Sequence, residues 1–373
     1  MTALAWFPEP SFSYNAGVKT WDAIIVGAGI IGLTLARELR KTGRRILVLE
    51  RGEPGQEASY AAGGMLADCG PETPREIQEL ASMSARMYPE FVHEVQDEAG
   101  IDVDLRAQGT ISFDGLQYSC LNPSTLGLSA HELKVHEPGL IPPGAIATLF
   151  PERSVDPRAL TAAVLNACRH RGVDISSGSE VTSIDVTGGR VVGVSTKKTK
   201  YSTPVVVNCA GAWSGQLGEP TWPVRPVKGQ MLAVAMPRRE FLKHVIRTAD
   251  VYLIPRSSGR LLIGATLEEA GFDKRTVPDT IRRLYNAALR LMPELKDAKI
   301  LEDWAGLRPG TADGLPILGR TDVEGYYVAT GHYRDGILLA PATAAIMETL
   351  IAGGKPLCEV SAFTPLRFKT AVH

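Results

Sequence analysis

Short apolar runs and helically spaced apolar positions alternate near the start of the chain. Residues 22–27 (DAIIVG) and 44–50 (RRILVLE) are short runs rich in β-branched side chains, which are typical of buried parallel strands. The segment LTLARELRKTG between them has helical periodicity and ends at Gly43, a residue type that commonly follows a helix. Residues 22–50 therefore predict a strand–helix–strand unit.

Further along the chain, the regular alternation of strand and helix is lost. Amphipathic spacing predicts helices at 75–98 and 157–171, and residues 203–215 predict a buried strand that enters a turn of small residues. Strands predominate elsewhere, at 109–113, as a strand–hairpin–strand unit at 172–196, and at several places within 221–265. This arrangement predicts a two-domain α/β (α+β) fold in which an α/β domain is interwoven with a mainly antiparallel one.

A glycine motif occupies the first turn of the strand–helix–strand unit. Gly27 permits the tight turn, Gly29 lets the backbone approach a pyrophosphate, and Gly32 lets the helix pack closely on the strand. Glu50 ends the second strand 18 residues beyond Gly32, near the spacing of about 20 expected of an acid that bonds a ribose hydroxyl. The unit predicts a Rossmann-like site for FAD or NAD, and the carboxylate disfavours NADP.

The segment after the second strand favours FAD over NAD. Residues 51–66 (RGEPGQEASYAAGGML) form a long stretch of small residues, which lets backbone amides crowd against a ligand. A simple NAD domain would instead continue with repeated strand–helix units. The stretch AAGGML is too apolar for a mobile surface loop. We therefore expect a second contact with the pyrophosphate and flavin of FAD.

Composition and charge exclude several classes of partner. The chain has 373 residues, 44% of them apolar and 22% charged, and its net charge of -1 without a basic run gives no indication of a nucleic acid or anionic membrane partner. No apolar run is long enough to span a membrane, and no secretory signal is present. Five scattered cysteines without a CxxC pair fit small buried residues in a reducing cytoplasm. Residues 1–20 are read as an irregular N-terminal extension.

Two residues stand out as candidates for ligand binding. Arg308 lies in the otherwise apolar or turn-forming stretch WAGLRPGTADGLPILG, where a guanidinium needs an anionic partner. That partner is either a ligand carboxylate or a neighbouring acid such as Asp303 or Asp313. Tyr252, in an apolar strand, is by itself most simply a core residue whose hydroxyl has a partner.

The sequence has no HExxH or GxSxG motif and no histidine or cysteine cluster with metal spacing.

Taken together, several stretches resemble the D-amino-acid oxidase superfamily of flavoproteins, and within it the bacterial glycine oxidases. The matching stretches span residues 22 to about 350 in order: AIIVGAGIIG, AAGGML, VVNCAGAWSG, VKGQML, YLIPRSSGRLLIGAT, WAGLRPGTADGLPILG and GHYRDGILLAPATA. The last three are the specific ones. The resemblance implies an FAD-binding domain at 21–104, 150–220 and 304–365, and a substrate-binding domain at 105–149 and 221–303.

The resemblance also implies roles for individual residues. Arg308 would bind the carboxylate of the substrate, Tyr252 would help to hold it, and Arg334 would lie near that carboxylate or over the flavin, unless it pairs with an acid at the surface. The remaining positions would bind FAD, in addition to the three glycines of the motif: Ile30, Ile31, Glu50, Arg51, Ala58, Ser59, Gly63, Gly64, Met65, Val181, His332, Tyr333, Arg334, Asp335, Gly336, Ile337 and Leu338. Gly336 would begin a helix whose N-terminal dipole stabilises negative charge on the reduced flavin.

The implied reaction needs no protein base or nucleophile. The amine of a small amino acid (glycine, sarcosine or a D-amino acid) would deliver its α-hydride to flavin N5, and hydrolysis would give a 2-oxo acid and ammonia or an amine. Molecular oxygen would reoxidise the flavin to give hydrogen peroxide. FAD would be non-covalent, because residues 304–336 contain no cysteine. Leu267 and Asp250 depart from the family pattern, so substrate preference stays open. The resemblance further implies thiamine (thiazole) biosynthesis and a homo-oligomer, namely a tetramer.

Two alternatives remain at this point. A flavin-dependent amino-acid dehydrogenase would have the same architecture and pass electrons to an acceptor other than oxygen, and no residue in the sequence decides oxygen reactivity. The other alternative is a nucleic-acid-modifying flavoprotein or a non-catalytic FAD-binding module. The near-neutral charge argues against RNA, and the Arg308 and Tyr252 pair argues against a module without activity.

Overall fold

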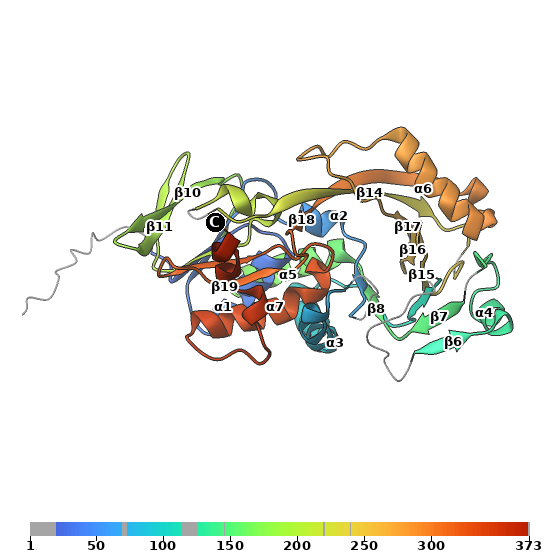
Figure 1. The fold of residues 1–373 in the computed structure, drawn as a ribbon, viewed down its shortest axis with the longest axis horizontal. Helices are drawn as coiled ribbons and strands as arrows, with labels where there is room; N and C mark the ends of the chain where they lie inside the picture. The colour runs from blue at the N-terminus through green and yellow to red at the C-terminus, as the bar shows by residue number, and fades with distance from the viewer. Residues whose placement is uncertain are drawn as a thin grey trace, which may run out of the picture.

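Two large sheets, each with its own core, make up most of the molecule (Figure 1). The computed structural model describes residues 20–68, 73–113, 125–144, 146–218, 221–238 and 240–371. The predicted N-terminal extension, except for residue 20, and two of the cysteines, Cys69 and Cys120, lie outside these residues. Of the other cysteines, Cys168 and Cys209 are buried with free thiols, as predicted, and Cys358 is half-buried.

The first sheet has six strands and contains the predicted strand–helix–strand unit. Its order is β19 (Ile317–Arg320), β20 (Tyr326–Thr330), β13 (Val206–Asn208), β1 (Ala23–Val26), β2 (Ile46–Leu49) and β9 (Asp174–Ser176). All neighbours are parallel except β19 and β20. Every residue of β1 and β2 is buried, which explains their continuous apolar sequence. The predicted strands at 22–27 and 44–50 are confirmed, and so is the strand predicted to enter a turn within 203–215, which is β13.

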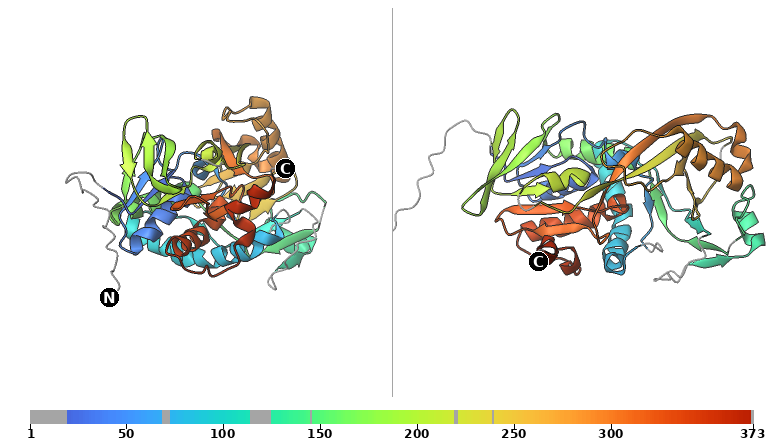
Figure 2. Two further views of the ribbon diagram at one scale, coloured as in Figure 1. Left: turned by 60° about the vertical axis from the view of Figure 1, so that its left-hand side comes forward. Right: turned by 45° about the horizontal axis from the view of Figure 1, so that its top comes forward.

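Helices cover one face of this sheet and a smaller sheet covers the other (Figure 2, left). Ile25 packs in a cluster with the helices, whereas Ile24 and Val26 pack toward the smaller sheet, as the alternation of a strand requires. The helices are α1 (Ile30–Lys41), α3 (Gln78–Ala99), α5 (Pro157–His170) and α7 (Gly336–Ile351). The smaller sheet consists of β10 (Val181–Thr187), β11 (Arg190–Thr196) and β12 (Lys200–Ser202).

The second large sheet has eight strands. Its order is β18 (Ile300–Gly310), β14 (Arg225–Ala235), β17 (Arg260–Gly264), β16 (Tyr252–Pro255), β15 (Val245–Arg247), β5 (Thr110–Ser112), β7 (Ala147–Phe150) and β6 (Leu126–Leu128). All pairs are antiparallel except β15 with β5. One face packs on α6 (Pro278–Leu291) and α4 (Ala130–His136). The fold class predicted from the sequence is confirmed.

The long strands β14 and β18 connect the two halves of the molecule (Figure 2, right). The predicted domain boundary between residues 303 and 304 falls inside β18, which pairs with β14 of the eight-stranded sheet on both sides of that boundary. A fourth sheet, with the order β3 (Met65–Leu66), β8 (Arg153–Val155) and β4 (Leu105–Arg106), also lies between the halves. The stretch 51–66, predicted as a loop, contains one helical turn, α2 (Ala58–Ala61). The remaining elements are short 3-10 helices, η1 (Arg75–Ile77), η2 (Gly211–Gln216), η3 (Pro293–Asp297), η4 (Ser361–Phe363) and η5 (Pro365–Ala371).

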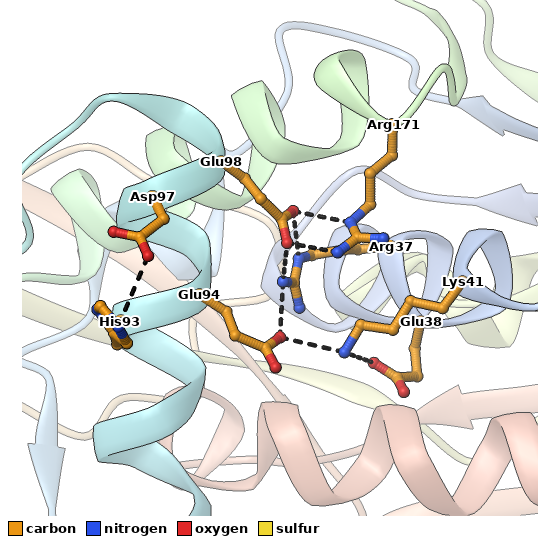
Figure 3. A network of polar contacts seen from close by, with 8 residues as sticks. All are labelled: Arg37, Glu38, Lys41, His93, Glu94, Asp97, Glu98 and Arg171. Carbon is orange, nitrogen blue, oxygen red and sulfur yellow. Dashed lines mark hydrogen bonds and ion pairs between the residues drawn. The ribbon is translucent and has the colours of Figure 1, made fainter.

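An ion-pair network around the buried Arg37 joins three of the helices (Figure 3). The side chain of Arg37, on α1, is 1% exposed; its Nε donates to Glu98 Oε2 at 2.9 Å and its Nη2 donates to Glu94 Oε2 at 2.8 Å. Both acids lie on α3. Arg171, which follows α5, also donates to Glu98 Oε2, at 2.8 Å. Burial alone would raise the pKa of Glu98, but hydrogen bonds from the two arginines lower it to about 2.

No helix among the described residues is both long and apolar enough to cross a bilayer. The described residues also contain no group of three or more histidine, cysteine or acidic side chains arranged to hold a metal ion.

Candidate cofactor and substrate site

A cavity of about 1040 Å³ lies between the two large sheets. Its wall begins at the end of β1, passes along α2 and the start of α7, and reaches β16 and β18. Ligands of open α/β sheets bind beyond the carboxyl ends of the parallel strands. The cavity lies at the carboxyl ends of the parallel strands β1, β2 and β13. One cavity therefore joins the predicted nucleotide site to the predicted substrate residues.

The glycine turn after β1 has no room for side chains at two positions. Gly27 has φ +107°, and a Cβ there would lie 2.5 Å from the Cys209 carbonyl oxygen. A Cβ at Gly32 would lie 2.0 Å from the Gly27 carbonyl oxygen. Gly27, Gly29, Ile30 and Ile31 line the cavity, whereas Gly32 lies behind them and lets α1 pack on the turn. The amide ends of α1 therefore face the cavity, which suits a phosphate.

Glu50 holds the glycine turn in place. Its carboxylate is nearly buried, with Oε2 accepting from Ala28 N and Oε1 accepting from Gly52 N, each at 2.9 Å. Glu50 and its neighbour Arg51 both line the cavity. The ribose contact expected of these residues stays a prediction. Val181, at the start of β10, lines the same end of the cavity.

The small residues after α2 approach other segments closely. A Cβ at Gly64, which has φ +74°, would lie 2.1 Å from the Val155 carbonyl oxygen, and one at Gly63 would lie 2.8 Å from Ile254 Cδ1. The buried guanidinium of Arg256 donates to the Gly63 carbonyl oxygen. The sequence analysis did not identify Arg256 as a residue that supports this loop. The predicted cofactor residues of this segment all line the cavity: Ala58, Ser59, Gly63, Gly64 and Met65.

The start of α7 forms the opposite wall. His332 is buried beside Thr343 (Nε2 to Oγ1, 3.1 Å), and burial lowers its pKa to about 3, so the imidazole is neutral near pH 7. Asp335 is the N-cap of α7, and burial raises its pKa to about 6. Residues 332–337 line the cavity, but Leu338 does not; it is buried in the helix-covered core. The helix begins at Gly336, as predicted.

The register of the eight-stranded sheet brings Tyr252 to the cavity. Tyr252 lies opposite Arg247 on β15 and opposite Gly264 on β17, and Gly264 lies opposite Met231 on β14. Directly opposed residues share one face of a sheet, and all four line the cavity. A Cβ at Gly264 would be 2.8 Å from the Tyr252 ring, so glycine leaves the space for that ring. Burial raises the pKa of Tyr252, while the nearby Arg308 opposes that rise.

Arg308 lies on the same face, over Gly229. A Cβ at position 229 would lie 2.2 Å from Arg308 Nη1, so the guanidinium rests directly on this glycine. Nη1 donates to the Thr266 carbonyl oxygen at 3.2 Å. Among the described residues no carboxylate lies within 4.0 Å of Arg308; Asp313 instead pairs with Arg367 at 2.8 Å. The alternative of a salt bridge with Asp303 or Asp313 is therefore wrong.

The other predicted substrate residue, Arg334, is more exposed. Its guanidinium lies 5.2 Å from the Tyr333 ring centroid. Burial lowers the pKa of Arg334, and the neighbouring carboxylate of Asp335 opposes that shift. Arg334 lines the cavity, as do the two residues that depart from the family pattern, Leu267 and Asp250. Asp250 pairs with Arg290 at 3.5 Å.

The segment after β17 contacts residues that line the cofactor end of the cavity, which the sequence did not indicate. The ring of Phe272 lies 5.3 Å from that of Trp213, and the Arg51 guanidinium lies over the same Trp213 ring at 3.5 Å. Lys274 Nζ lies 2.9 Å from Glu57 Oε2. The substrate half of the molecule thus contacts the loop that follows β2.

Comparisons with known proteins agree with this geometry. The sequence profile of the family described as FAD dependent oxidoreductase matches residues 22–350. A glycine oxidase from Pseudomonas aeruginosa is 34% identical over 362 residues, covering 92% of this chain and 98% of that protein. A bifunctional protein ThiO/ThiG from Synechocystis sp. is 35% identical over 364 residues, covering 95% of this chain and 55% of that protein.

A solved structure shows the same architecture. The crystal structure of glycine oxidase from Geobacillus kaustophilus matches with a TM-score of 0.87 and 29% identity, covering 93% of this chain and 99% of that chain. The family profile covers well over half of the chain, and the shared fold extends over nearly all of it. This chain therefore belongs to the family of FAD-dependent oxidoreductases.

Proposed function

We propose that this protein catalyses the FAD-dependent oxidative deamination of glycine, sarcosine and small D-amino acids, with release of hydrogen peroxide. One observation carries the proposal: the half-buried guanidinium of Arg308 faces the cavity beside Tyr252 with no carboxylate partner among the described residues. An arginine fork binds a carboxylate through two parallel hydrogen bonds, and a small amino acid supplies that group.

The residues present fit FAD. Gly27, Gly29 and Gly64 present bare backbone to the cavity, and Gly32 behind them lets α1 pack closely on the turn, so the backbone forms a cradle against which a dinucleotide can lie. The start of α1 would hold the pyrophosphate, Glu50 and Arg51 would hold the ribose, and the start of α7 would face the isoalloxazine. When bound, FAD supplies the redox chemistry by accepting the α-hydride of the amino acid. The absence of a cysteine in 304–336 supports non-covalent binding.

The chain's own residues orient the substrate. Arg308 would bind its carboxylate, and the Tyr252 hydroxyl, which is held in a largely apolar wall beside Met231 Sδ (3.6 Å), would donate to the same group. His332 is neutral and contacts Thr343, so its role is to position the start of α7 rather than to remove a proton. The amino group of the substrate itself supplies the electron pair that drives hydride release.

A peroxide assay tests the proposal. Purified yellow protein with glycine, sarcosine or D-alanine in air is expected to release peroxide, and L-alanine is expected to give none. Flavin bleaching under nitrogen without peroxide in air would instead identify a dehydrogenase that uses another acceptor. If none of these amino acids bleaches the flavin, Arg308 must bind a different anion.

Several finer proposals accompany this function. We place FAD binding at 21–104, 150–220 and 304–365 and substrate binding at 105–149 and 221–303, with a location in the cytoplasm and assembly as a homotetramer. The similarity to a protein named ThiO/ThiG supports a role in thiamine biosynthesis. Gel filtration with light scattering checks the assembly.

The glycine beneath Arg308 offers a test of its placement. Gly229→Ala would put a Cβ 2.2 Å from Arg308 Nη1, so the guanidinium must move by about 1 Å, and misplacement of that size lowers rates by up to about 100-fold. We expect kcat/KM for glycine to fall about tenfold to a hundredfold. Gly127→Ala, on β6 of the same sheet, meets no atom within 4 Å and is the matched control. Equal rates in both variants would contradict the placement.

A further inference from the structure

The carbonyl that holds Arg308 belongs to a segment outside the strands. Thr266 follows β17, and its carbonyl oxygen accepts from Arg308 Nη1. Thr266 is paired with Gln230 of β14: Thr266 N donates to the Gln230 carbonyl oxygen at 3.3 Å, and Gln230 N donates to Thr266 Oγ1 at 2.9 Å. The place of the guanidinium therefore depends on what fixes Thr266.

A single carboxylate, that of Glu268, fixes this segment through contacts that do not involve Arg308. Glu268 Oε1 accepts from Thr266 Oγ1 and from Gln230 Nε2, the latter at 2.8 Å. Glu268 Oε2 lies 4.0 Å from Lys228 Nζ. The backbones of Glu268 and Lys228 exchange two hydrogen bonds of 2.9 Å each. Glu268 thus joins the segment to β14 through both its side chain and its backbone.

The groups that meet this carboxylate are shielded from water. Gln230 is fully buried and Lys228 is 2% exposed. The Gln230 carbonyl oxygen Oε1 accepts from Val277 N at 2.7 Å, which directs its amide nitrogen toward Glu268. Buried donors and a buried ammonium require a partner, because leaving them unpaired costs free energy. Removing the carboxylate would therefore make the Thr266 segment rearrange.

We propose that Glu268 is a positioning residue for substrate binding, which acts through Thr266 to hold the Arg308 guanidinium where it meets the substrate carboxylate. This inference rests on the proposed function, because it takes Arg308 as the carboxylate-binding group. Glu268 itself contacts no substrate in this scheme. Its effect must therefore appear in carboxylate affinity and must depend on Arg308.

The test uses acetate as a simple carboxylate, titrated into the flavin-loaded enzyme and followed by the flavin absorbance spectrum. We expect Glu268→Ala to bind acetate at least tenfold more weakly and to raise KM for glycine by a similar factor, while kcat changes less than threefold. Glu269→Ala is the matched control, since the adjacent side chain is 61% exposed and pairs with Arg225 at 3.1 Å. An acetate Kd within twofold of wild type in Glu268→Ala would overturn the inference.

A double variant tests the route through Arg308. In the Arg308→Leu background, Glu268→Ala is expected to change kcat/KM for glycine less than twofold, and a full additional loss would overturn the inference. If Glu268→Ala does not fold, Thr266→Val replaces it, with at least threefold weaker acetate binding expected and an unchanged Kd as the overturning result. Acetate binding that is as tight in Arg308→Leu as in wild type would contradict the proposed function itself, whatever Glu268 does.

Discussion

Replacing Arg308 with leucine is expected to lower kcat/KM for glycine by roughly 30- to 5000-fold. Truncating one member of a buried, hydrogen-bonded charge pair costs about 2–5 kcal/mol, and each 1.36 kcal/mol is a factor of ten in rate. The effect should be this large because Arg308 is the guanidinium that packs on Gly229 and bonds to the Thr266 carbonyl oxygen, and leucine offers no donor in its place. Steady-state peroxide release as a function of glycine concentration measures the loss.

Flavin content separates this effect from damage to the cofactor site. Arg308 lies on β18, and the cofactor cradle is built from the glycine turn and the loop after α2, so the flavin-to-protein absorbance ratio of Arg308→Leu should match wild type. Arg308→Lys is the informative companion, because it keeps the charge and loses the planar fork. We expect it to fall between the leucine variant and wild type. A leucine variant within threefold of wild type would show that the carboxylate binds elsewhere.

Local sequence was enough to predict the nucleotide half. The strand, glycine turn, helix and acid of 22–50 are consecutive, so one short segment contains both the pattern and the geometry. The start of α7 was predictable for the same reason, since Gly336 begins a long apolar helix. Where one segment supplies the whole feature, periodicity and residue type suffice.

The surroundings of Arg308 could not be predicted in this way. Gly229, Thr266 and Arg308 meet only because β14 pairs with both β17 and β18, and that register connects residues far apart in the chain. Residue type alone favoured a salt bridge between Arg308 and an acid such as Asp303 or Asp313, and only the surrounding motif favoured a ligand. In the structure, Asp313 pairs with Arg367 from the C-terminal turn. A signal was present in the small residues at 229, 264 and 306, which lie on the cavity face of their strands.

Two of the predicted cofactor residues, Gly32 and Leu338, do not line the cavity. Gly32 and Leu338 occupy helix positions that turn into the packed core, one against the Gly27 carbonyl and the other among the helices. Each lies next to residues that do line the cavity, Ile31 and Ile337. A motif names consecutive residues, whereas a helix presents only part of its circumference to a ligand.

Replacing Arg37 with methionine is expected to lower the free energy of unfolding by about 3 kcal/mol. Removing one partner of a buried ion pair costs about 3–5 kcal/mol, because the remaining charge is left in a low-dielectric site. The lower end applies here, since Glu98 keeps its bonds to Arg171 when Arg37 is removed. Methionine fills similar volume, so the loss reports on the charge. Urea denaturation followed by circular dichroism measures it in wild type and variant.

The pH dependence of the same variant distinguishes an ionic effect from a packing effect. Because the pKa of Glu98 is lowered to about 2 from its usual 4.5, its ionised form stabilises the folded state above pH 4.5, and this stabilisation is lost as the pH falls toward 2. Arg37→Met should therefore lose less stability than wild type between pH 4.5 and pH 2, so the two curves converge in acid. Arg190→Met, which breaks the exposed pair with Glu324, should cost less than about 1 kcal/mol and shift the curve little. Parallel curves for wild type and Arg37→Met would mean that packing, and not the ion pair, joins the three helices.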